Sequence, residues 1–176
     1  RTRRSFRNCA QSSKRTSSAV GWTPGTCPGD SSWIPKSISA AAGLATCGYM
    51  PFVSTFALFI SLRAGDQMRA QIAYPSLNVK LIGGYAGLSD FADGASHQSV
   101  EDIAVMRAVP NVTIVSPCDL TETKLAVRAI AAHEGPVFLR ISRDAVSDLF
   151  GEDHPFEIGK GIVVREGSDV AIVATG

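Results

Sequence analysis

Short apolar segments alternate with longer amphipathic segments over residues 38–141, and this alternation restricts the fold more than any other feature of the sequence. The expected strands are residues 51–55, 78–82, 112–115 and 136–141. Strands that are separated by helices of about ten to fifteen residues predict parallel pairing through right-handed crossovers. Residues 78–82 form an apolar run, as in a sheet that is covered on both faces. We therefore expect an α/β fold of three layers, a mostly parallel sheet with helices on both faces.

Helix signals fill the intervals between these strands. We expect helices at residues 38–48, 56–73, 99–107 and 120–132. Ser99 is the predicted N-cap of the third helix, with Asp102 three residues later, and Asp119 is the predicted N-cap of the fourth. Gly48 is expected to close the first helix in a left-handed conformation.

The two ends of the chain differ in composition from this central part. Residues 1–40 carry seven basic residues and one acid, Asp30, for a charge of +6, whereas the remainder carries −5, which gives the net charge of +1. Residues 1–37 lack periodicity and are predicted to be disordered. The mildly acidic body argues against a specific nucleic-acid partner.

We divide the chain into three parts. Residues 38–150 are the expected folded domain, in a chain that is 45% hydrophobic and 19% charged, as in globular proteins. Residues 151–176 are a polar connection with predicted strands in 159–167 and 169–174, the second of which is expected to begin another α/β unit in which the sequence is truncated.

The cysteines and the hydropathy of the sequence indicate the cellular compartment in which we expect the protein. The four cysteines show no CxxC spacing, which suits a reducing cytoplasm and predicts neither a zinc site nor a disulfide framework. Cys118 is either a reactive thiol near a site or, in our preferred interpretation, a small buried side chain. The chain lacks a run of eighteen apolar residues, so we expect no membrane insertion.

The segment 83–98, GGYAGLSDFADGASHQ, is the candidate site. It holds two acids, one histidine and four glycines directly after an expected buried strand. Ligands of open α/β sheets bind beyond the carboxyl ends of the strands, and glycines allow a close approach of backbone to ligand. Composition alone leaves open a second interpretation, a glycine-rich surface loop in which His97 has no function.

A family resemblance favours the first interpretation. The segments PFVSTFALFISLRAGDQMR, GGYAGLSDFADGASHQSVEDIAVMRAVPNVTIVSP and LRISR occur in one order and at plausible spacing. Together they resemble the pyrimidine-binding domain of transketolases, most closely the separately encoded carboxyl-terminal half of split transketolases, from about residue 40 to residue 176. Deoxyxylulose phosphate synthases and the beta subunits of 2-oxoacid dehydrogenases share related pieces and remain alternatives.

The resemblance implies a chemistry. Family members use thiamine diphosphate to move a two-carbon ketol unit between sugar phosphates, as in the pentose phosphate pathway, and the protein contributes geometry and electrostatics. Phe56 and Phe59 match positions that hold the pyrimidine ring. From the sequence alone, both rings could equally be core residues that pack a helix onto the sheet.

The resemblance also assigns the substrate contacts. Asp93 and His97 match positions that bind the donor hydroxyls, and His97 is also the expected catalytic residue that moves protons. Arg143 matches an arginine that receives the substrate phosphate. The alternative for Arg143 is an ion pair with Asp144 or Asp148. Tyr85 stands where a histidine is usual, so recognition there is expected to differ.

The family's activating glutamate is missing. It is expected near Ile34, where the sequence reads WIPKSIS, and the first glutamate of the chain is Glu101. Asp30 is a poor substitute on spacing and length. Because the match to the family begins abruptly, we hypothesise a frame error or a degraded gene start upstream, and we expect impaired activity.

A partner is implied as well. The resemblance places the diphosphate and its divalent metal, such as Mg²⁺, on another domain with a GDG motif that this sequence lacks, and no metal ligands are expected in this chain. An N-terminal transketolase-type subunit is therefore the expected partner, in a dimer or other homo- or hetero-oligomer that is inactive without it. The alternative function is a non-catalytic pairing or regulatory subunit.

Overall fold

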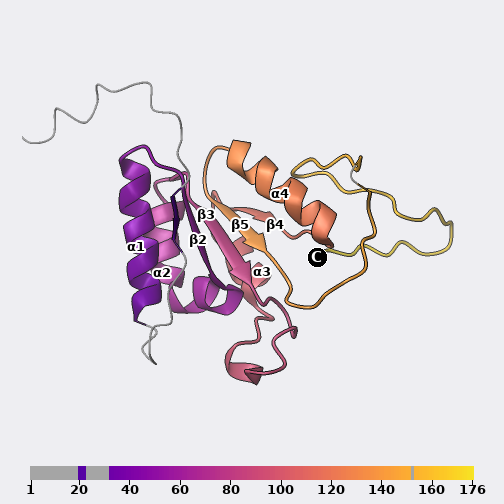
Figure 1. Cartoon of the computed structure of the whole chain (residues 1–176), viewed down its shortest axis with the longest axis horizontal. Coiled ribbons are helices and arrows are strands. Elements are labelled where there is room, and N and C mark those ends of the chain that lie inside the picture. Colours follow the sequence, from indigo (N-terminus) through magenta and orange to yellow (C-terminus); the bar gives the residue numbers. More distant parts are fainter. Residues whose placement is uncertain (1–19, 23–31, 152) are drawn as a thin grey trace, which may run out of the picture.

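The computed structural model describes residues 20–22 (backbone only), 32–151 and 153–176. Five strands form one sheet in the order β1-β2-β3-β5-β4 (Figure 1). The strands are β1 (Val20–Trp22), β2 (Pro51–Phe56), β3 (Lys80–Gly84), β4 (Thr113–Val115) and β5 (Val137–Arg140). Every pairing among them is parallel, which confirms the predicted α/β fold.

The register brings the functional segments to one edge of the sheet. Phe56 at the end of β2 lies opposite Gly84 of β3, and Gly83 lies opposite Arg140 at the end of β5. Because the strands are parallel, the segments that follow them all leave at this carboxyl edge.

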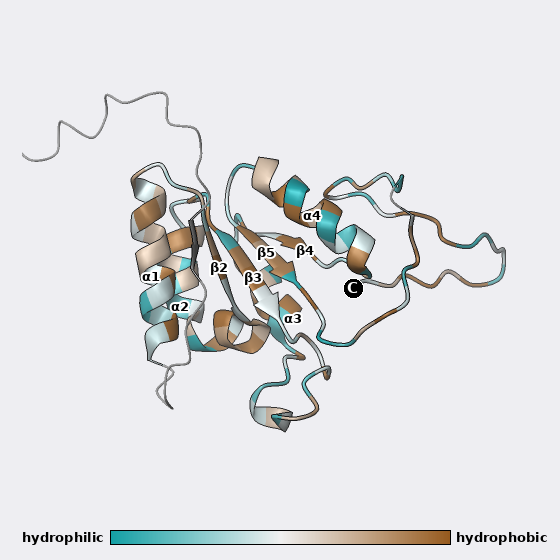
Figure 2. Ribbon diagram, in the orientation of Figure 1, coloured by the Kyte–Doolittle hydropathy of each residue, from teal (hydrophilic) through white to brown (hydrophobic). Residues whose placement is uncertain are grey.

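Helices cover the first face of the sheet. They are α1 (Trp33–Thr46), the continuous helical run η1 (Phe59–Arg63), α2 (Gly65–Gln67) and η2 (Met68–Ala73), and α3 (Asp102–Arg107). Ile38, Ile60 and Met106 from three of these helices are fully buried in one core with Leu81 and Phe138 of the sheet. Figure 2 shows hydrophobic residues along the strands and a mixture of hydrophilic and hydrophobic residues on α1.

The opposite face is covered by α4 (Leu120–Ala132). Ala126 and Ile130 of α4 pack on Val137 and Leu139, the residues of β5 that alternate with Phe138. Phe156 and Ile158, beyond the last strand, pack against the same cluster. The sheet therefore lies between two helical layers, as the sequence predicts.

Two predictions about the chain ends need correction. Residues 33–37 belong to α1 and residues 20–22 form β1, so these parts of the expected disordered segment 1–37 are ordered; residues 1–19 and 23–31, Asp30 included, lie outside the described residues. Ile34 explains the longer helix, because it is buried one turn before Ile38 on the same face, and Pro35 is tolerated in a first turn.

The strand predictions after residue 158 are wrong. Among the described residues 153–176, no strand forms, and Val163 and Ile172 are 71% and 89% exposed. A strand is stabilised by a paired neighbour, and the structure gives this segment none. No helix in the described part of the chain has the length and apolar character needed to cross a bilayer.

Gly48 follows the end of α1 in the predicted left-handed conformation, with φ at 84°, and one of the two N-cap predictions is confirmed. The Asp119 carboxylate accepts the Glu122 N–H at 2.7 Å at the start of α4, as predicted. Ser99 does not cap α3, which begins at Asp102 after the N-cap Glu101, and its buried hydroxyl has no hydrogen-bond partner in the described structure. The cap prediction fails because the Ser99 backbone is paired with Gly87 in the preceding loop.

Candidate active site

The segment between β3 and α3, residues 85–101, carries most of the candidate site residues. The start of this segment is hydrogen-bonded to the residue that follows β5: the Ala86 N–H donates to the Ile141 carbonyl at 3.1 Å. Gly87 and Ser99 then exchange backbone hydrogen bonds of 2.7 and 2.9 Å, so the segment closes on itself. The intervening residues form a loop that contains the single turn η3 (Gly94–Ser96).

Four rings from two segments meet beside this loop. The centroid of Phe56 lies 5.1 Å from Phe59, 4.5 Å from Tyr85 and 5.1 Å from His97. Phe59 also lies 5.2 Å from His97, with the two rings edge-on. These spacings are typical of interacting aromatic pairs. The structure thus brings together four of the candidate residues.

The two phenylalanines differ in exposure. Phe59 is 8% exposed, and the Arg63 guanidinium covers it at 4.0 Å from the ring centroid. Phe56 is only half-buried, at the carboxyl end of β2. The half-buried ring leaves an apolar surface on which a flat heteroaromatic group can stack.

Asp93 and His97 lie at either end of η3. The backbone N–H of His97 donates to the Gly94 carbonyl at 2.9 Å, and the ring atom Nδ1 of His97 lies 2.9 Å from the Ser96 hydroxyl. Asp93 is exposed, and its carboxylate makes no hydrogen bond within the described part of the chain. A free carboxylate and an imidazole on one turn can accept and transfer protons at a bound hydroxyl.

Tyr85 has an unusual backbone conformation, with φ at 57°. Left-handed backbone is unfavourable for a bulky non-glycine residue, so the packing around Tyr85 must hold it. The Tyr85 ring contacts Phe56, and the Arg143 guanidinium lies 5.2 Å from the Tyr85 ring centroid. Tyr85 therefore links the aromatic cluster to Arg143.

Arg143 follows β5 and forms an ion pair that the sequence did not suggest. Its Nη1 lies 2.8 Å from Asp90 Oδ1, so the proposed partners Asp144 and Asp148 were both wrong. Asp90 is fully buried, whereas the Arg143 side chain is 36% exposed. The partner lies 53 residues earlier in the chain, and only the fold brings the two together.

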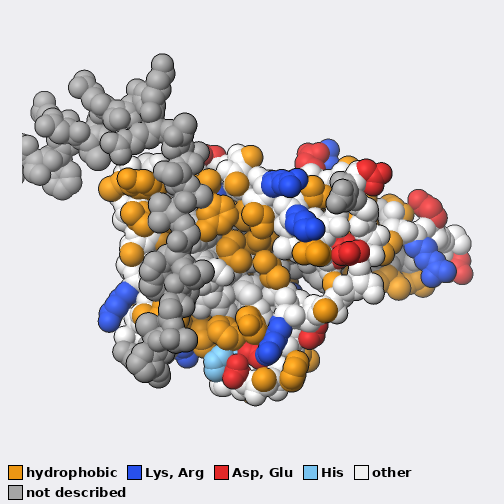
Figure 3. All heavy atoms as spheres, viewed as in Figure 1, with side chains coloured by type: hydrophobic (Ala, Val, Ile, Leu, Met, Phe, Trp, Pro, Cys, Tyr) orange, Lys and Arg blue, Asp and Glu red, His pale blue; other side chains and the backbone are white. Residues whose placement is uncertain are grey.

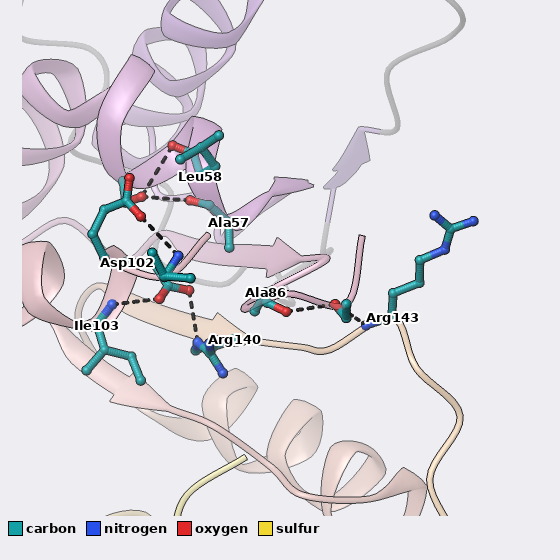
Figure 4. A network of polar contacts seen from close by, with 11 residues as sticks. Ala57, Leu58, Ala86, Asp102, Ile103, Arg140 and Arg143 are labelled. Atoms are coloured by element: carbon teal, nitrogen blue, oxygen red, sulfur yellow. Dashed lines mark hydrogen bonds and ion pairs between the residues drawn. The ribbon is translucent and has the colours of Figure 1, made fainter. Parts of the chain in front are cut away.

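A second pair ties α3 to β5. Arg140 Nε donates to Asp102 Oδ2 at 2.9 Å, and Asp102 Oδ1 accepts the Ile103 N–H (Figure 4). The sequence does not predict this pair either, because the position of Asp102, three residues after Ser99, indicates only a helix cap. Arg140 also lines a cavity of about 280 Å³ at the carboxyl edge, together with Ser89, Ser116 and Ser142.

Cys118 and the potential metal ligands bear on which reactions the chain itself can carry out. Burial, aided by the neighbouring Glu122, raises the pKa of the Cys118 thiol to about 11, so that it is a protonated, weakly nucleophilic group. Within the described residues, no group of three potential metal ligands occurs. Figure 3 shows histidine, acidic and basic side chains gathered beside hydrophobic ones on one face of the molecule.

The position expected for the activating glutamate is apolar. Ile34, in the first turn of α1, is 1% exposed and belongs to the hydrophobic core. An isoleucine cannot accept a hydrogen bond, so this residue cannot act as the carboxylate of the family pattern.

Comparison with known proteins agrees with this geometry. The sequence model of the family described as "Transketolase, pyrimidine binding domain" matches residues 36–148. The chain is 46% identical over 141 residues to a "Putative transketolase C-terminal section" of Methanocaldococcus jannaschii, covering 79% of this chain and 45% of the relative. It is 40% identical over 139 residues to a "6-deoxy-6-sulfo-D-fructose transketolase subunit" of a Clostridium species, covering 79% of this chain and 43% of the relative.

A solved structure gives the same result. The chain is similar to a "Split gene transketolase, inactive beta4 tetramer", with a TM-score of 0.69 and 42% identity over 76% of this chain and 43% of that one. The chain thus spans less than half the length of these relatives. The matched domain and the sheet agree, and the chain belongs to the transketolase family, whose members depend on thiamine diphosphate, as its pyrimidine-binding domain.

Proposed function

We propose that the chain supplies the pyrimidine-binding half of a thiamine diphosphate-dependent transferase that moves a two-carbon ketol unit between sugars. Sugar phosphates are the substrate class that the resemblance implies. The observation that carries the proposal is the cluster of Phe56, Phe59 and His97 at the carboxyl edge of the sheet.

The residues of this cluster fit the pyrimidine half of the cofactor. Phe56 and Phe59 would hold the ring, because the half-buried Phe56 offers an apolar surface that the tilted Phe59 supports from 5.1 Å away. When bound, the cofactor supplies the carbanion chemistry that amino-acid side chains lack.

The loop supplies the groups that would contact the sugar. His97 would exchange a proton at the reacting hydroxyl, with the Ser96 hydroxyl at 2.9 Å from Nδ1 to orient the ring. Asp93 would accept hydrogen bonds from donor hydroxyls, since its carboxylate is exposed. Arg143 and Tyr85 lie next to each other and would bind the far end of the substrate.

The partner in this proposal is an N-terminal transketolase-type subunit that holds the diphosphate and a divalent metal such as Mg²⁺. The names of the similar proteins, a C-terminal section and a subunit, support such a division of labour. The complex would be a dimer or larger oligomer that works in the pentose phosphate pathway of the cytoplasm.

A second candidate is a non-catalytic subunit that binds the partner and the cofactor without turnover. The buried Ile34 favours it, because the expected activating carboxylate is not available at this position. Circular dichroism of thiamine diphosphate with the partner present separates the two candidates. A bound-cofactor signal without ketol transfer supports the second one.

The experiment that tests the first candidate is a ketol-transfer assay of the complex with a ketose phosphate donor and an aldose acceptor. We expect turnover that is impaired by the lack of the expected glutamate, and we expect His97→Asn to lower kcat by a further factor of about 100 while the cofactor signal stays. His133→Asn is the matched control, since His133 contacts Thr113 at the other edge of the sheet. Pyruvate decarboxylation without ketol transfer would instead favour a deoxyxylulose phosphate synthase or a 2-oxoacid dehydrogenase subunit.

A further inference from the structure

Arg143 is fixed at two points by the loop that precedes α3. Its guanidinium Nη1 donates to Asp90 Oδ1 at 2.8 Å, and its backbone N–H donates to the Ser89 hydroxyl at 3.1 Å. Ser89 in turn donates to the Ala86 carbonyl at 2.7 Å (Figure 4). Both the main chain and the side chain of Arg143 therefore take their position from residues 86–90.

Asp90 is held at least as firmly. The side chain is fully buried, and its backbone carbonyl accepts hydrogen bonds from the Gly94 N–H at 3.2 Å and the Gln98 amide at 3.4 Å. Its second carboxylate oxygen, Oδ2, is buried and has no hydrogen-bond partner in the described structure. Such a carboxylate is little screened by water, so its negative charge acts strongly on its surroundings.

The net charge of the groups around the Arg143 guanidinium is therefore close to zero. Asp90 offsets the charge of Arg143, the neighbouring Tyr85 is a neutral ring, and Arg140 is itself paired with the buried Asp102. Asp144 is exposed and forms no ion pair within the described residues. Arg143 still has donors on Nε and Nη2, because Asp90 uses only Nη1.

We propose that Asp90 is a specificity-determining residue that adapts the Arg143 site to a substrate end with at most one negative charge and weakens the binding of a doubly charged phosphate. The inference rests on the proposed function, in which Arg143 faces the far end of the sugar. Attraction to a site rises in proportion to the ligand charge, whereas the cost of removing an ion from water rises with its square. A site of nearly zero net charge consequently favours the smaller charge.

Asp90→Asn is the informative variant. Asparagine keeps an oxygen that accepts from Arg143 Nη1, so the guanidinium stays in place while the negative charge is removed. Asp144→Asn is the matched control, because it removes the same charge next to Arg143 in the sequence but from a solvent-exposed position.

Binding of two probes can be measured on the full chain without any turnover. We would follow the Arg143 Nε–H signal of ¹⁵N-labelled protein, identified by its absence in Arg143→Met, while titrating inorganic phosphate or methanesulfonate at pH 8. Asp90→Asn should tighten phosphate binding about tenfold and methanesulfonate binding about threefold, since the effect on the free energy scales with ligand charge. Asp144→Asn should change neither by more than about twofold.

The wild-type chain provides a test that needs no variant. It should bind phosphate no more tightly than methanesulfonate at pH 8. Phosphate binding that is measurably tighter than methanesulfonate binding overturns the inference, as does an Asp90→Asn variant whose phosphate affinity is unchanged, weaker or undetectable.

Kinetics of the complex with the partner subunit add a second readout. Asp90→Asn should lower KM for a phosphorylated sugar about tenfold and leave KM for its unphosphorylated counterpart within about twofold. A purely structural role of Asp90 would raise both KM values and overturn the inference. If wild-type complex shows no ketol transfer, the proposed function fails, but the two anion titrations still decide the role of Asp90.

Discussion

The imidazole of His97 meets the ring of Phe56 edge-on, with 5.1 Å between the two centroids. Phe56 ends β2 and His97 follows η3, so the two residues come from different parts of the chain. Phe56 therefore supports the imidazole and, in the proposed function, also contacts the cofactor.

Replacement of Phe56 by alanine should affect binding far more than folding. We expect Phe56→Ala to lower the free energy of unfolding by about 1 to 3 kcal/mol, because the ring is half-buried. The circular dichroism signal of thiamine diphosphate should be lost in the presence of the partner. Tyr74→Ala, at an aromatic residue that is 86% exposed, should leave both properties unchanged. Normal cofactor binding by Phe56→Ala would contradict the assigned role.

Adjacent glycines of β3 should respond differently to an added methyl group. A Cβ at Gly83 would lie 2.6 Å from Phe138 Cε2 and 3.0 Å from Ala57 Cα, whereas at Gly84 the nearest atom is 3.8 Å away. We expect Gly83→Ala to destabilise the fold by about 1 to 3 kcal/mol, and Gly84→Ala by less than about 1. Urea unfolding measures both values. Adding Phe138→Leu to Gly83→Ala should recover part of the loss, and equal losses for the two glycines would show that this contact is unimportant.

Asp119 should make stability sensitive to acid. Burial alone would raise its pKa, but the N–H groups of Glu122, Phe150 and Leu149 outweigh burial and hold the pKa below its usual value. A depressed carboxylate pKa stabilises the fold above the unfolded-state pKa of about 3.9, and that contribution disappears as the pH falls through the folded-state pKa.

We therefore expect Asp119→Ala to lose about 2 to 4 kcal/mol at pH 7 and to show a weaker dependence of stability on pH below about pH 4 than wild type. Denaturant unfolding between pH 2 and pH 7, a range that includes the titration of aspartate, measures both effects. Asp66→Ala, at an exposed acid in the first turn of α2, is the control and should change little. Parallel pH curves for wild type and Asp119→Ala would refute the prediction.

Lys80 should make stability depend on pH as well, in the alkaline range. It is fully buried, and its Nζ donates to the carbonyls of His133 at 2.7 Å and Gly135 at 2.8 Å. Burial lowers its pKa to about 8, although Glu134 acts in the opposite direction. Between that pKa and the usual value of about 10.4, the unfolded chain binds more protons than the folded one, so stability should rise with pH.

The matching experiment compares wild type with Lys80→Met in urea from pH 7 to pH 10.5, the interval that spans both pKa values. The stability of wild type relative to Lys80→Met should rise across this range by at most about 3 kcal/mol, since each pKa unit corresponds to about 1.4 kcal/mol. Lys124→Met, at an exposed residue of α4, should show no such trend. A stability difference that does not vary with pH would mean that the burial of Lys80 leaves its titration unchanged.

Local patterns predicted the elements whose causes are local. The strand expected at 51–55 is β2, Pro51–Phe56. A strand of a sheet that helices cover on both faces appears in the sequence as a short apolar run, so it can be recognised locally. Asp119 caps α4 as predicted, since an N-cap depends on residues within one turn. The Ser99 cap failed because a backbone pairing with Gly87, twelve residues earlier, competes with the helix start.

By itself, the sequence determined the parallel α/β fold, its family and the identity of the aromatic and loop residues at the candidate site. Those signals lie in short segments, and their periodicity and order can be recognised without knowledge of contacts between distant residues. Only the tertiary structure decided that Asp90 pairs with Arg143 and Asp102 with Arg140, because these charges come from segments 53 and 38 residues apart that meet only when the parallel strands align. The charge that the site presents to a substrate therefore depends on the folded arrangement, and composition does not reveal it.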